Sequence, residues 1–382
     1  MRLVYIYSEL PSYVRVNKNL SVFSNKFDEV HYIGANRNGI DWVDGYLADN
    51  VFCHIFDSRI PNGGFKSIIK SISFSFFASQ KLNAIKPDIL VLGNEEAYVP
   101  FLLSNVTRRD TKIICELLDS LAIRLTGRLT VLTPFARAFS SYVLNVSDRV
   151  VEVSEARLSR HKNKENKFSV IHNSPEENFL DSELLSDLLT QRLDGIQDFI
   201  YVSGSVVPHI SGVESLLAAV EELNDEGYRV SIVYSGRLNG EWANNSFFSS
   251  KYVHSLGCLT PSQSLNLAQK SIAMFAFYKP INLNYVYAAP NKVYDAIRIA
   301  KPVLMNSECK AKYLLNDFGL LLESSFGNVS QIKKNIVSLL NEGQPTIKEK
   351  AEIKERYDKE FSWPIMVKKW NQVLNEVENE RK

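Results

Sequence analysis

The sequence lacks the short motifs that mark the commonest metal and dinucleotide sites. No Asp-x-Asp pair occurs in its 382 residues, so we do not expect a metal that bridges a diphosphate from such a pair. No G-x-G-x-x-G follows an apolar run, which argues against a Rossmann oxidoreductase. The 4 cysteines form no C-x-x-C pair and do not cluster with the 6 histidines, which favours reduced thiols and a cytoplasmic compartment. We predict neither a metal nor a cofactor.

Charge imbalance and long apolar runs are also missing. The net charge is +1, so no field of the whole molecule attracts nucleic acid, and we expect no nucleic-acid partner. We expect neither a signal peptide nor a spanning helix, because no run is long and apolar enough. With 45% hydrophobic and 23% charged residues, the composition is that of a globular protein, and the length allows two domains.

Two successive alternations of strand and helix predict two α/β domains. Most strand candidates are continuous apolar runs, as in a parallel sheet covered by helices on both faces. In the first half these runs are 3–7, 29–33, 51–55, 88–92, 112–115, 150–153 and 168–171. After a polar stretch over 173–197, taken as the linker, they are 199–203, 229–234, 252–255, 272–277, 302–305 and 320–322.

The expected fold class is α/β, with two Rossmann-like, doubly wound domains facing across a cleft. The predicted bounds are 1–180 for the N-terminal domain and 190–360 for the C-terminal domain. A C-terminal helix within 361–382 is expected to pack back toward the first domain.

The most informative segment is Ala289–Ala296, followed by Lys301–Leu304. It predicts a loop, a short helix from Asn291 and then a buried strand. Free backbone N–H groups at a helix N-terminus and the ammonium of Lys292 suit a diphosphate, and Asp295, one turn later, suits ribose hydroxyls. The alternative is that Lys292 and Asp295 only pair with each other on a helix surface.

This segment resembles the donor-site motif of GT-B glycosyltransferases, in the retaining group called family four: Pro-Asn-Lys-x-x-Glu-Ala, then Lys-Pro-Val. Further segments are similar to the family in the same order, namely 151–155, 168–175, 201–205, 233–237 and 253–261. The likeness covers most of the chain, most densely from about residue 150 to 325. It implies an acceptor-side domain over 1–180 and a nucleotide-sugar domain over 190–360, with the donor held by Ser205, Arg237, Pro290, Asn291, Lys292 and Asp295.

The chain departs from the family at several functional positions. Ser205 and Ser211 stand where many members carry an arginine and a lysine aimed at the donor diphosphate. Tyr287 replaces the first of a pair of glutamates, and Leu118 replaces a histidine that contacts the donor sugar. Either the donor is held differently, or catalysis has been weakened or lost.

One stretch has no acidic residue. From 242 to 294 there is no Asp or Glu, while Lys251, Lys270, Lys279 and Lys292 occur there. This favours a local field that attracts an anion. An acid-poor, buried-sheet stretch can also arise by chance.

In the N-terminal domain, polar residues after two strands are candidates for catalysis and acceptor binding. The resemblance makes Asp119 a catalytic candidate together with Lys292, and capping of the following helix is the alternative for Asp119. Asn94 and Glu95, after another strand, could orient acceptor hydroxyls or act as a base. Solvated loop residues are the alternative for both.

Two basic, apolar segments, 64–86 and 121–146, suggest amphipathic helices that lie on an anionic bilayer. Core helices of an α/β layer have a similar pattern.

We therefore expect a cytoplasmic, metal-independent glycosyltransferase of the hexosyltransferase type, peripheral on the inner face of the membrane. The resemblance implies transfer from a nucleotide sugar onto a glycan or lipid-linked glycan, with retention, in the synthesis of a bacterial surface polysaccharide such as lipopolysaccharide or capsule. The alternative is a catalytically degenerate binding or scaffold protein that assists an active transferase.

Overall fold

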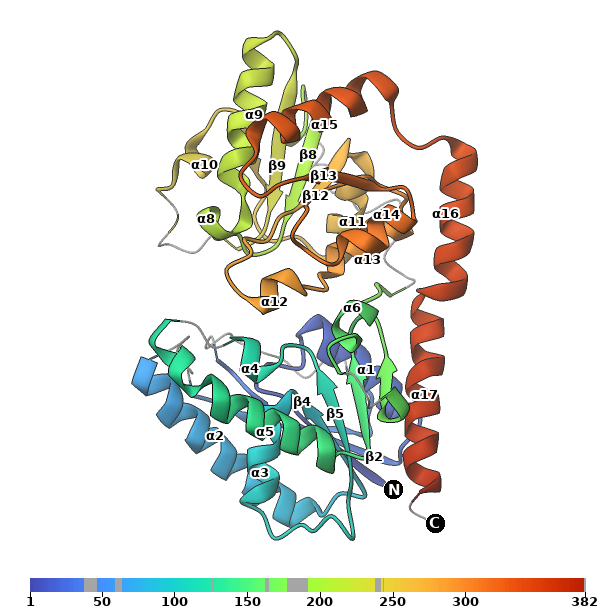
Figure 1. The fold of residues 1–382 in the computed structure, drawn as a ribbon. Coiled ribbons are helices and arrows are strands. Elements are labelled where there is room, and N and C mark those ends of the chain that lie inside the picture. The colour runs from blue at the N-terminus through green and yellow to red at the C-terminus, as the bar shows by residue number, and fades with distance from the viewer. Residues whose placement is uncertain are drawn as a thin grey trace. The chain divides into compact units, whose positions relative to one another are not determined.

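The computed structural model describes residues 1–37, 47–58, 64–124, 127–161, 165–176, 192–237, 242 and 244–380. Contacts divide the chain into two compact units (Figure 1). The first unit comprises Met1–His172 and Met366–Lys382, and the second comprises Asn173–Ile365. The domain limits expected at 180 and 190 fall within 177–191, outside the described residues.

A seven-stranded parallel sheet forms the first unit, in the order β3-β2-β1-β4-β5-β6-β7. Its strands are β1 (Arg2–Ile6), β2 (Glu29–Ala35), β3 (Val51–Phe56), β4 (Ile89–Gly93), β5 (Lys112–Leu117), β6 (Arg149–Glu152) and β7 (Phe168–Val170). Each coincides with a predicted run, because a strand covered on both faces is apolar at consecutive positions. β4, for example, is buried throughout.

The helices of the first unit connect these strands. They are α1 (Val14–Ser24), α2 (Gly64–Ile85), η1 (Glu95–Ala97), α3 (Tyr98–Leu102), α4 (Leu121–Arg124), η2 (Gly127–Leu132), α5 (Thr133–Val146), α6 (Glu155–Leu158), η3 (Glu165–Lys167) and α17 (Trp363–Asn379).

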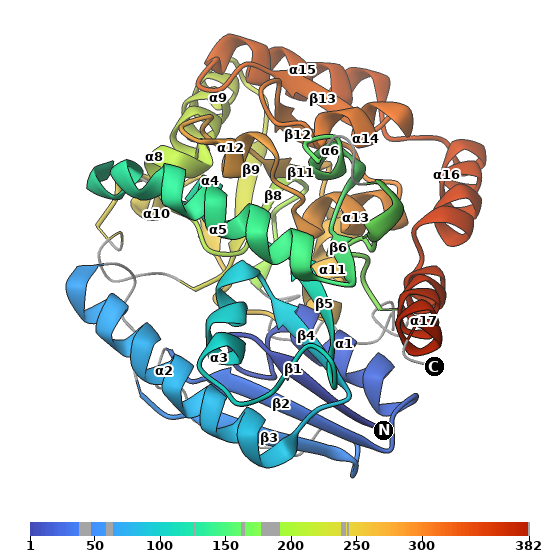
Figure 2. The same ribbon diagram turned by 60° about the horizontal axis from the view of Figure 1, so that its bottom comes forward.

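These helices cover both faces of the sheet. α2, α3 and α5 pack on the face that carries Val4 and Ile6, and Figure 2 shows α2 running along it. α1 and α17, from Met366 onward, cover the other face. There the ring of Phe23 lies 5.8 Å from that of Tyr5 and 5.2 Å from that of the fully buried Trp370. The C-terminal helix thus completes the core of the first unit.

The second unit is built on a six-stranded parallel sheet, in the order β10-β9-β8-β11-β12-β13. Its strands are β8 (Asp198–Ser203), β9 (Val230–Ser235), β10 (Val253–Ser255), β11 (Ala273–Ala276), β12 (Val303–Asn306) and β13 (Leu321–Ser324). Its helices are α8 (Pro208–Ser211), α9 (Val213–Asp225), α10 (Ser246–Ser249), α11 (Pro261–Lys270), α12 (Leu283–Val286), α13 (Asn291–Arg298), α14 (Lys312–Asp317), α15 (Val329–Glu342) and α16 (Ile347–Glu360).

Two apolar layers cover this second sheet. α9, α10 and α15 pack on one face, against Ile200, Ile232 and Phe275. α11, α13, α14 and α16 pack on the other, against Tyr201 and Met274. The prediction of two Rossmann-like, doubly wound sheets is confirmed.

Each sheet has a point at which the strand order reverses. In the first unit it lies between β1 and β4, and in the second between β8 and β11. In doubly wound sheets, the loops that leave the two central strands at such a point turn in opposite directions, and ligands bind there, outside the carboxyl ends of the strands. These two edges are therefore the candidate binding sites of the two sheets.

Candidate functional site

Lys292 connects the two central strands of the second unit. It lies in the first turn of α13, which follows β11, and its Nζ donates a hydrogen bond of 3.0 Å to the carbonyl oxygen of Ser203, the last residue of β8. Burial lowers the pKa of Lys292 to about 8, against the opposing effect of the Asp295 carboxylate. The ammonium is thus held at the point where the strand order reverses.

The sequence of α13 separates a buried face from a polar one. Val293, Tyr294, Ala296 and Ile297 are buried in the core, whereas Asn291 is exposed and Lys292 and Asp295 are half-buried. The cap residue is Pro290, which supplies no side-chain hydrogen bond to the helix start. The first N–H groups of α13 and Lys292 therefore belong to the same turn, as predicted. Lys292 does more than pair with Asp295, because it also binds the end of β8.

Backbone and amide contacts fix the loop that leads into α13. The side-chain amide of Asn306, at the end of β12, accepts from the N–H of Tyr278 at 2.7 Å and donates to its carbonyl at 3.0 Å. The N–H of Lys310 donates to the carbonyl of Val286 at 2.7 Å. Sequence reasoning missed Asn306, although an amide at the end of an apolar strand is a signal for such a role.

The loops after β8 and β9 bring Ser205 and Arg237 to the same edge. Both residues are exposed, and the N–H of Gly204 donates to the carbonyl of Ser235 at 2.8 Å. Gly236 is required here, because a Cβ atom on it would lie 2.1 Å from the carbonyl oxygen of Gly204. The two loops approach each other too closely for any other residue.

Ser211, one of the departures from the family pattern, has a local structural role. The hydroxyl of Ser211, at the end of α8, accepts from the N–H of Val207 at 3.2 Å. Tyr287, another departure, is half-buried and follows the end of α12, where its backbone N–H donates to the carbonyl of Leu283, the first residue of that helix. Ser211 therefore holds its own turn.

The acid-free stretch divides between the two edges of the sheet. Lys279 and Lys292 follow β11, at the carboxyl edge, whereas Lys251 precedes β10 and Lys270 ends the helix before β11, at the opposite edge. A carboxylate, Glu308, also follows β12 and accepts from the Asn306 amide at 2.9 Å. The expected cationic field thus reduces to Lys279 and Lys292, because folding distributes a contiguous stretch over both ends of a parallel sheet.

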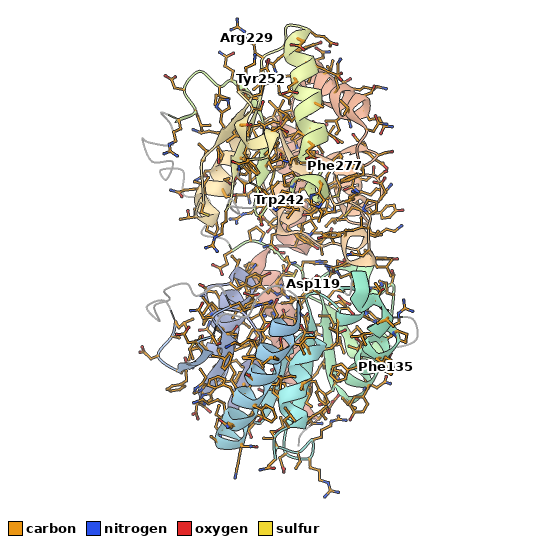
Figure 3. The ribbon with its side chains drawn as sticks, turned by 90° about the vertical axis from the view of Figure 1, so that its left-hand side faces the viewer. Asp119, Phe135, Arg229, Trp242, Tyr252 and Phe277 are labelled. Atoms are coloured by element: carbon orange, nitrogen blue, oxygen red, sulfur yellow. The ribbon has the colours of Figure 1, made fainter. Side chains whose placement is uncertain are left out.

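In the first unit, Asp119 lies at the carboxyl end of β5 (Figure 3). Its side chain is 43% exposed, and its Oδ1 lies 3.3 Å from an Nη atom of the buried Arg157. Arg157 also donates to the carbonyl of Leu118. No local sequence pattern indicated a role for Arg157, which comes from α6 and contacts Asp119 only in the folded unit.

Asn94 and Glu95 are buried and support the same loop. Asn94 has φ 68° and ψ 168°, a conformation that favours glycine, and its Oδ1 accepts from the N–H groups of Leu118 and Asp119, both at 2.8 Å. The carboxylate of Glu95 accepts from the hydroxyl of Ser120 at 2.8 Å and from the N–H of Leu121 at 3.1 Å. Glu95 thus performs the helix capping that was the alternative for Asp119. Contact of Asn94 or Glu95 with an acceptor remains a prediction, and the observed contacts hold the Asp119 loop.

Among the described residues, no group of three or more His, Cys, Asp or Glu side chains has an arrangement that could hold a metal ion. In the same part of the chain, no helix is long and apolar enough to cross a membrane.

No model of a known protein family matches the sequence, and no curated protein sequence matches it. Solved structures, in contrast, are similar over nearly the whole chain. HepE of Anabaena, solved with UDP and glucose, has a TM-score of 0.70 at 14% identity, and the match covers 98% of this chain and 99% of that one. Sucrose-phosphate synthase of Thermosynechococcus elongatus has a TM-score of 0.74 at 10% identity, with 100% of both chains covered.

A third neighbour is a putative UDP-N-acetylglucosamine 2-epimerase of Listeria monocytogenes, with a TM-score of 0.61 at 12% identity, covering 96% of this chain and 94% of that one. Identities this low identify the fold alone. Together with the two parallel, doubly wound sheets, the likeness over the full length identifies the fold of this chain as GT-B.

Proposed function

We propose that the chain is a glycosyltransferase that moves a sugar, of the hexosyl type, from a nucleotide-sugar donor. The observation that carries the proposal is the Nζ of Lys292 bound to the last carbonyl of β8, at the crevice where an α/β sheet binds its ligand. The bound UDP and glucose of HepE, a structural neighbour, are consistent with such a donor.

In this proposal the protein itself neutralises the departing diphosphate. Lys292, Arg237 and the N–H groups near Ser205 and Asn291 are the candidate donors, and Asp295 accepts from the ribose hydroxyls. Preorganised positive groups stabilise the leaving charge because they need no reorganisation during the reaction. We propose a metal-independent reaction on the sequence observation that Asp-x-Asp does not occur. Retention rests on the family resemblance.

The proposed acceptor is a glycan or lipid-linked glycan of a bacterial surface polysaccharide, reached from the cytoplasmic side of the membrane. Support comes from large apolar side chains on the surface of the first unit. In α2 they are Ile68, Ile69, Ile72 and Phe76, at the end of η2 they are Val131 and Leu132, and at the start of α5 it is Phe135, which is 74% exposed (Figure 3). We call these residues the apolar surface. A peripheral contact with the bilayer would cover them.

A scaffold without catalytic activity is the second candidate. The observation that favours it is the absence of a basic side chain at Ser205 and Ser211, with the Ser211 hydroxyl engaged in its own turn. Such a protein would bind a nucleotide sugar or a partner and transfer nothing.

Lys292→Ala tests the donor site. Thermal shift with UDP, GDP, CMP and dTDP, with their common sugars and with the free nucleosides, identifies the base. Lys292→Ala should then weaken diphosphate binding by about 1.5–3 kcal/mol, the value of a charge-assisted contact, and leave nucleoside binding unchanged. Equal losses for both ligands would mean that Lys292 acts through folding.

Turnover separates the candidate functions. Hydrolysis or transfer of the bound nucleotide sugar supports the transferase, whereas binding without turnover supports the scaffold. Conversion of UDP-N-acetylglucosamine to its epimer would instead indicate an epimerase, the activity for which one structural neighbour is named. If no nucleotide in the panel shifts the melting temperature, the proposed donor site is contradicted.

A further inference from the structure

The switch point of the first sheet carries a second group of aromatic and charged side chains. Tyr7 and Glu9 follow β1, Asp119 follows β5, and Tyr13 is the cap residue of α1. The rings of Tyr7 and Tyr13 lie 5.9 Å apart with an interplanar angle of 56°. Tyr13 is 47% exposed and Asp119 43% exposed, so a ligand can reach both.

The fold holds this group in place. The hydroxyl of Tyr32 donates to the backbone carbonyls of Tyr7 at 3.0 Å and Glu9 at 2.6 Å. The ring of Tyr7 lies directly on the end of β4, because a Cβ atom on Gly93 would come within 2.5 Å of it. Asp119 is held by Arg157 and by the Asn94 amide beneath its loop. These are fixed side chains on a sheet edge, as a binding site requires.

Negative charge predominates among the described residues of this group. Burial raises the pKa of the Tyr7 phenol most, and the neighbouring Tyr13, Glu9, Asp119 and Glu96 raise it further. Cations oppose them: Arg37 lies 3.4 Å from Glu9, and Arg157 lies 3.3 Å from Asp119. Arg15 also acts on the Tyr13 phenol, but it is paired with Glu116 at 2.7 Å. Burial raises the pKa of Glu9 despite Arg37, which reflects the cost of holding a charge there. A further anion would add to that cost.

We propose that Tyr7, Glu9, Tyr13 and Asp119 bind the terminal sugar of the acceptor, and that this sugar is neutral or cationic rather than anionic. This inference rests on the proposed function, because only a transferase has an acceptor. A sugar ring presents C–H groups that pack on an aromatic face and hydroxyls that donate to carboxylates, which accept only. An amino sugar would gain from both the carboxylates and the rings, whereas a uronic acid or sugar phosphate would be repelled.

Saturation-transfer NMR with soluble glycosides tests this site in the full chain. The probes are methyl β-glucoside, methyl β-glucosaminide and methyl β-glucuronide, at tens of millimolar. We expect the first two to bind several-fold more tightly than the glucuronide. Tyr13→Ala should abolish the contact and Tyr13→Phe should keep most of it. Asp119→Asn should raise the affinity for the glucuronide relative to the affinity for the glucoside. Tyr313→Ala, at a tyrosine 59% exposed in the second unit, is the matched control and should change nothing.

The outcomes separate this inference from the proposed function. Equal or tighter binding of the glucuronide, or wild-type binding by Tyr13→Ala, would overturn the inference. Nucleotide binding without any glycoside binding would also overturn it while leaving the donor site intact. Glycoside binding through Tyr13 in a protein that binds no nucleotide would keep the sugar site and overturn the transferase. An unchanged melting temperature of Tyr13→Ala guards against unfolding as the cause.

Discussion

Two opposing effects set the pKa of the Lys292 ammonium. Burial lowers its pKa to about 8, Asp295 opposes that shift, and the Ser203 carbonyl accepts a hydrogen bond from it at 3.0 Å. A phosphate placed beside it would restore the favourable environment that burial removed. A partly desolvated lysine is therefore better suited to an anionic ligand than one in bulk water.

This pKa predicts how diphosphate affinity depends on pH. Affinity should be constant just above neutral pH and fall as the pH rises through about 8, because the free protein loses the Lys292 proton there. Calorimetry should record proton uptake on binding above that pH. In Lys292→Ala the affinity should be nearly independent of pH over the same range, and a wild-type decline in that variant would assign the titration elsewhere.

Stability should change in the opposite direction over this window. The folded pKa of Lys292 is below that of an unfolded lysine, so the unfolded state binds more protons between the two values. The free energy of unfolding therefore rises with pH across the window. Lys301, whose pKa burial also lowers to about 8, contributes in the same way, so only the binding measurement isolates Lys292.

Asp295→Asn tests the carboxylate partner of the site. The change keeps the shape of the side chain but replaces a charged acceptor by a neutral one, so nucleotide affinity should fall by about 1–3 kcal/mol if Asp295 binds the ribose. Transfer should fall at least as far. Titration calorimetry with the responding nucleotide measures the loss. Unchanged binding and transfer with a lower melting temperature would make Asp295 a structural residue of α13.

At the scale of elements, the sheet edge proposed for the donor depends on how closely two loops approach each other. Gly204 follows β8 and Gly236 follows β9, and the carbonyl of one fills the place of a Cβ on the other. Gly236→Ala should therefore separate the loops and lower the free energy of unfolding by about 1–3 kcal/mol, as overpacking does.

Chemical denaturation measures this effect, and Ser205→Ala is its control for stability. Ser205 is exposed, so its loss should change the free energy of unfolding by less than about 0.5 kcal/mol. Gly236→Ala should also weaken nucleotide binding, because it displaces both Ser205 and Arg237. Wild-type stability of Gly236→Ala would show that the loops tolerate separation.

At the scale of the whole molecule, the apolar surface of the first unit predicts vesicle binding. Each large apolar side chain that enters a bilayer contributes about 1.5–3 kcal/mol, so Phe76→Asp and Phe135→Asp should each reduce sedimentation with phosphatidylglycerol vesicles about tenfold or more. Ile347→Asp, at a side chain 90% exposed in the second unit, is the matched control and should sediment like the wild type. The membrane proposal fails if the wild type stays in the supernatant.

The basic side chains of the segments 64–86 and 121–146 support the prediction of vesicle binding only in part. Arg137 is exposed on α5, whereas Lys70 donates to the Ser58 hydroxyl at 2.5 Å. Lys66, Arg124 and Arg128 also belong to these basic segments, but their side chains lie outside the described ones. Binding to neutral vesicles as strong as to anionic ones would assign the contact to the apolar residues alone.

The sequence alone determined the two sheets and the helix that we propose for the donor site. A strand buried on both faces must be a continuous apolar run, and a helix with one buried face must repeat every three to four residues, so both patterns are local and can be read directly. The same holds for α13, whose Lys292 and Asp295 were predicted at the start of a helix between two strands.

Tertiary structure alone decided which groups meet. Lys292 with Ser203, Asp119 with Arg157, and Tyr7 with Gly93 are separated by tens of residues, and no local pattern encodes such pairs. The same is true of charge and burial. The acid-free stretch divides over two edges of a sheet, Glu95 caps a helix from inside the core, and burial lowers the pKa of one lysine at a strand end. These properties depend on long-range packing, because desolvation and Coulomb interaction depend on distances in space rather than along the chain.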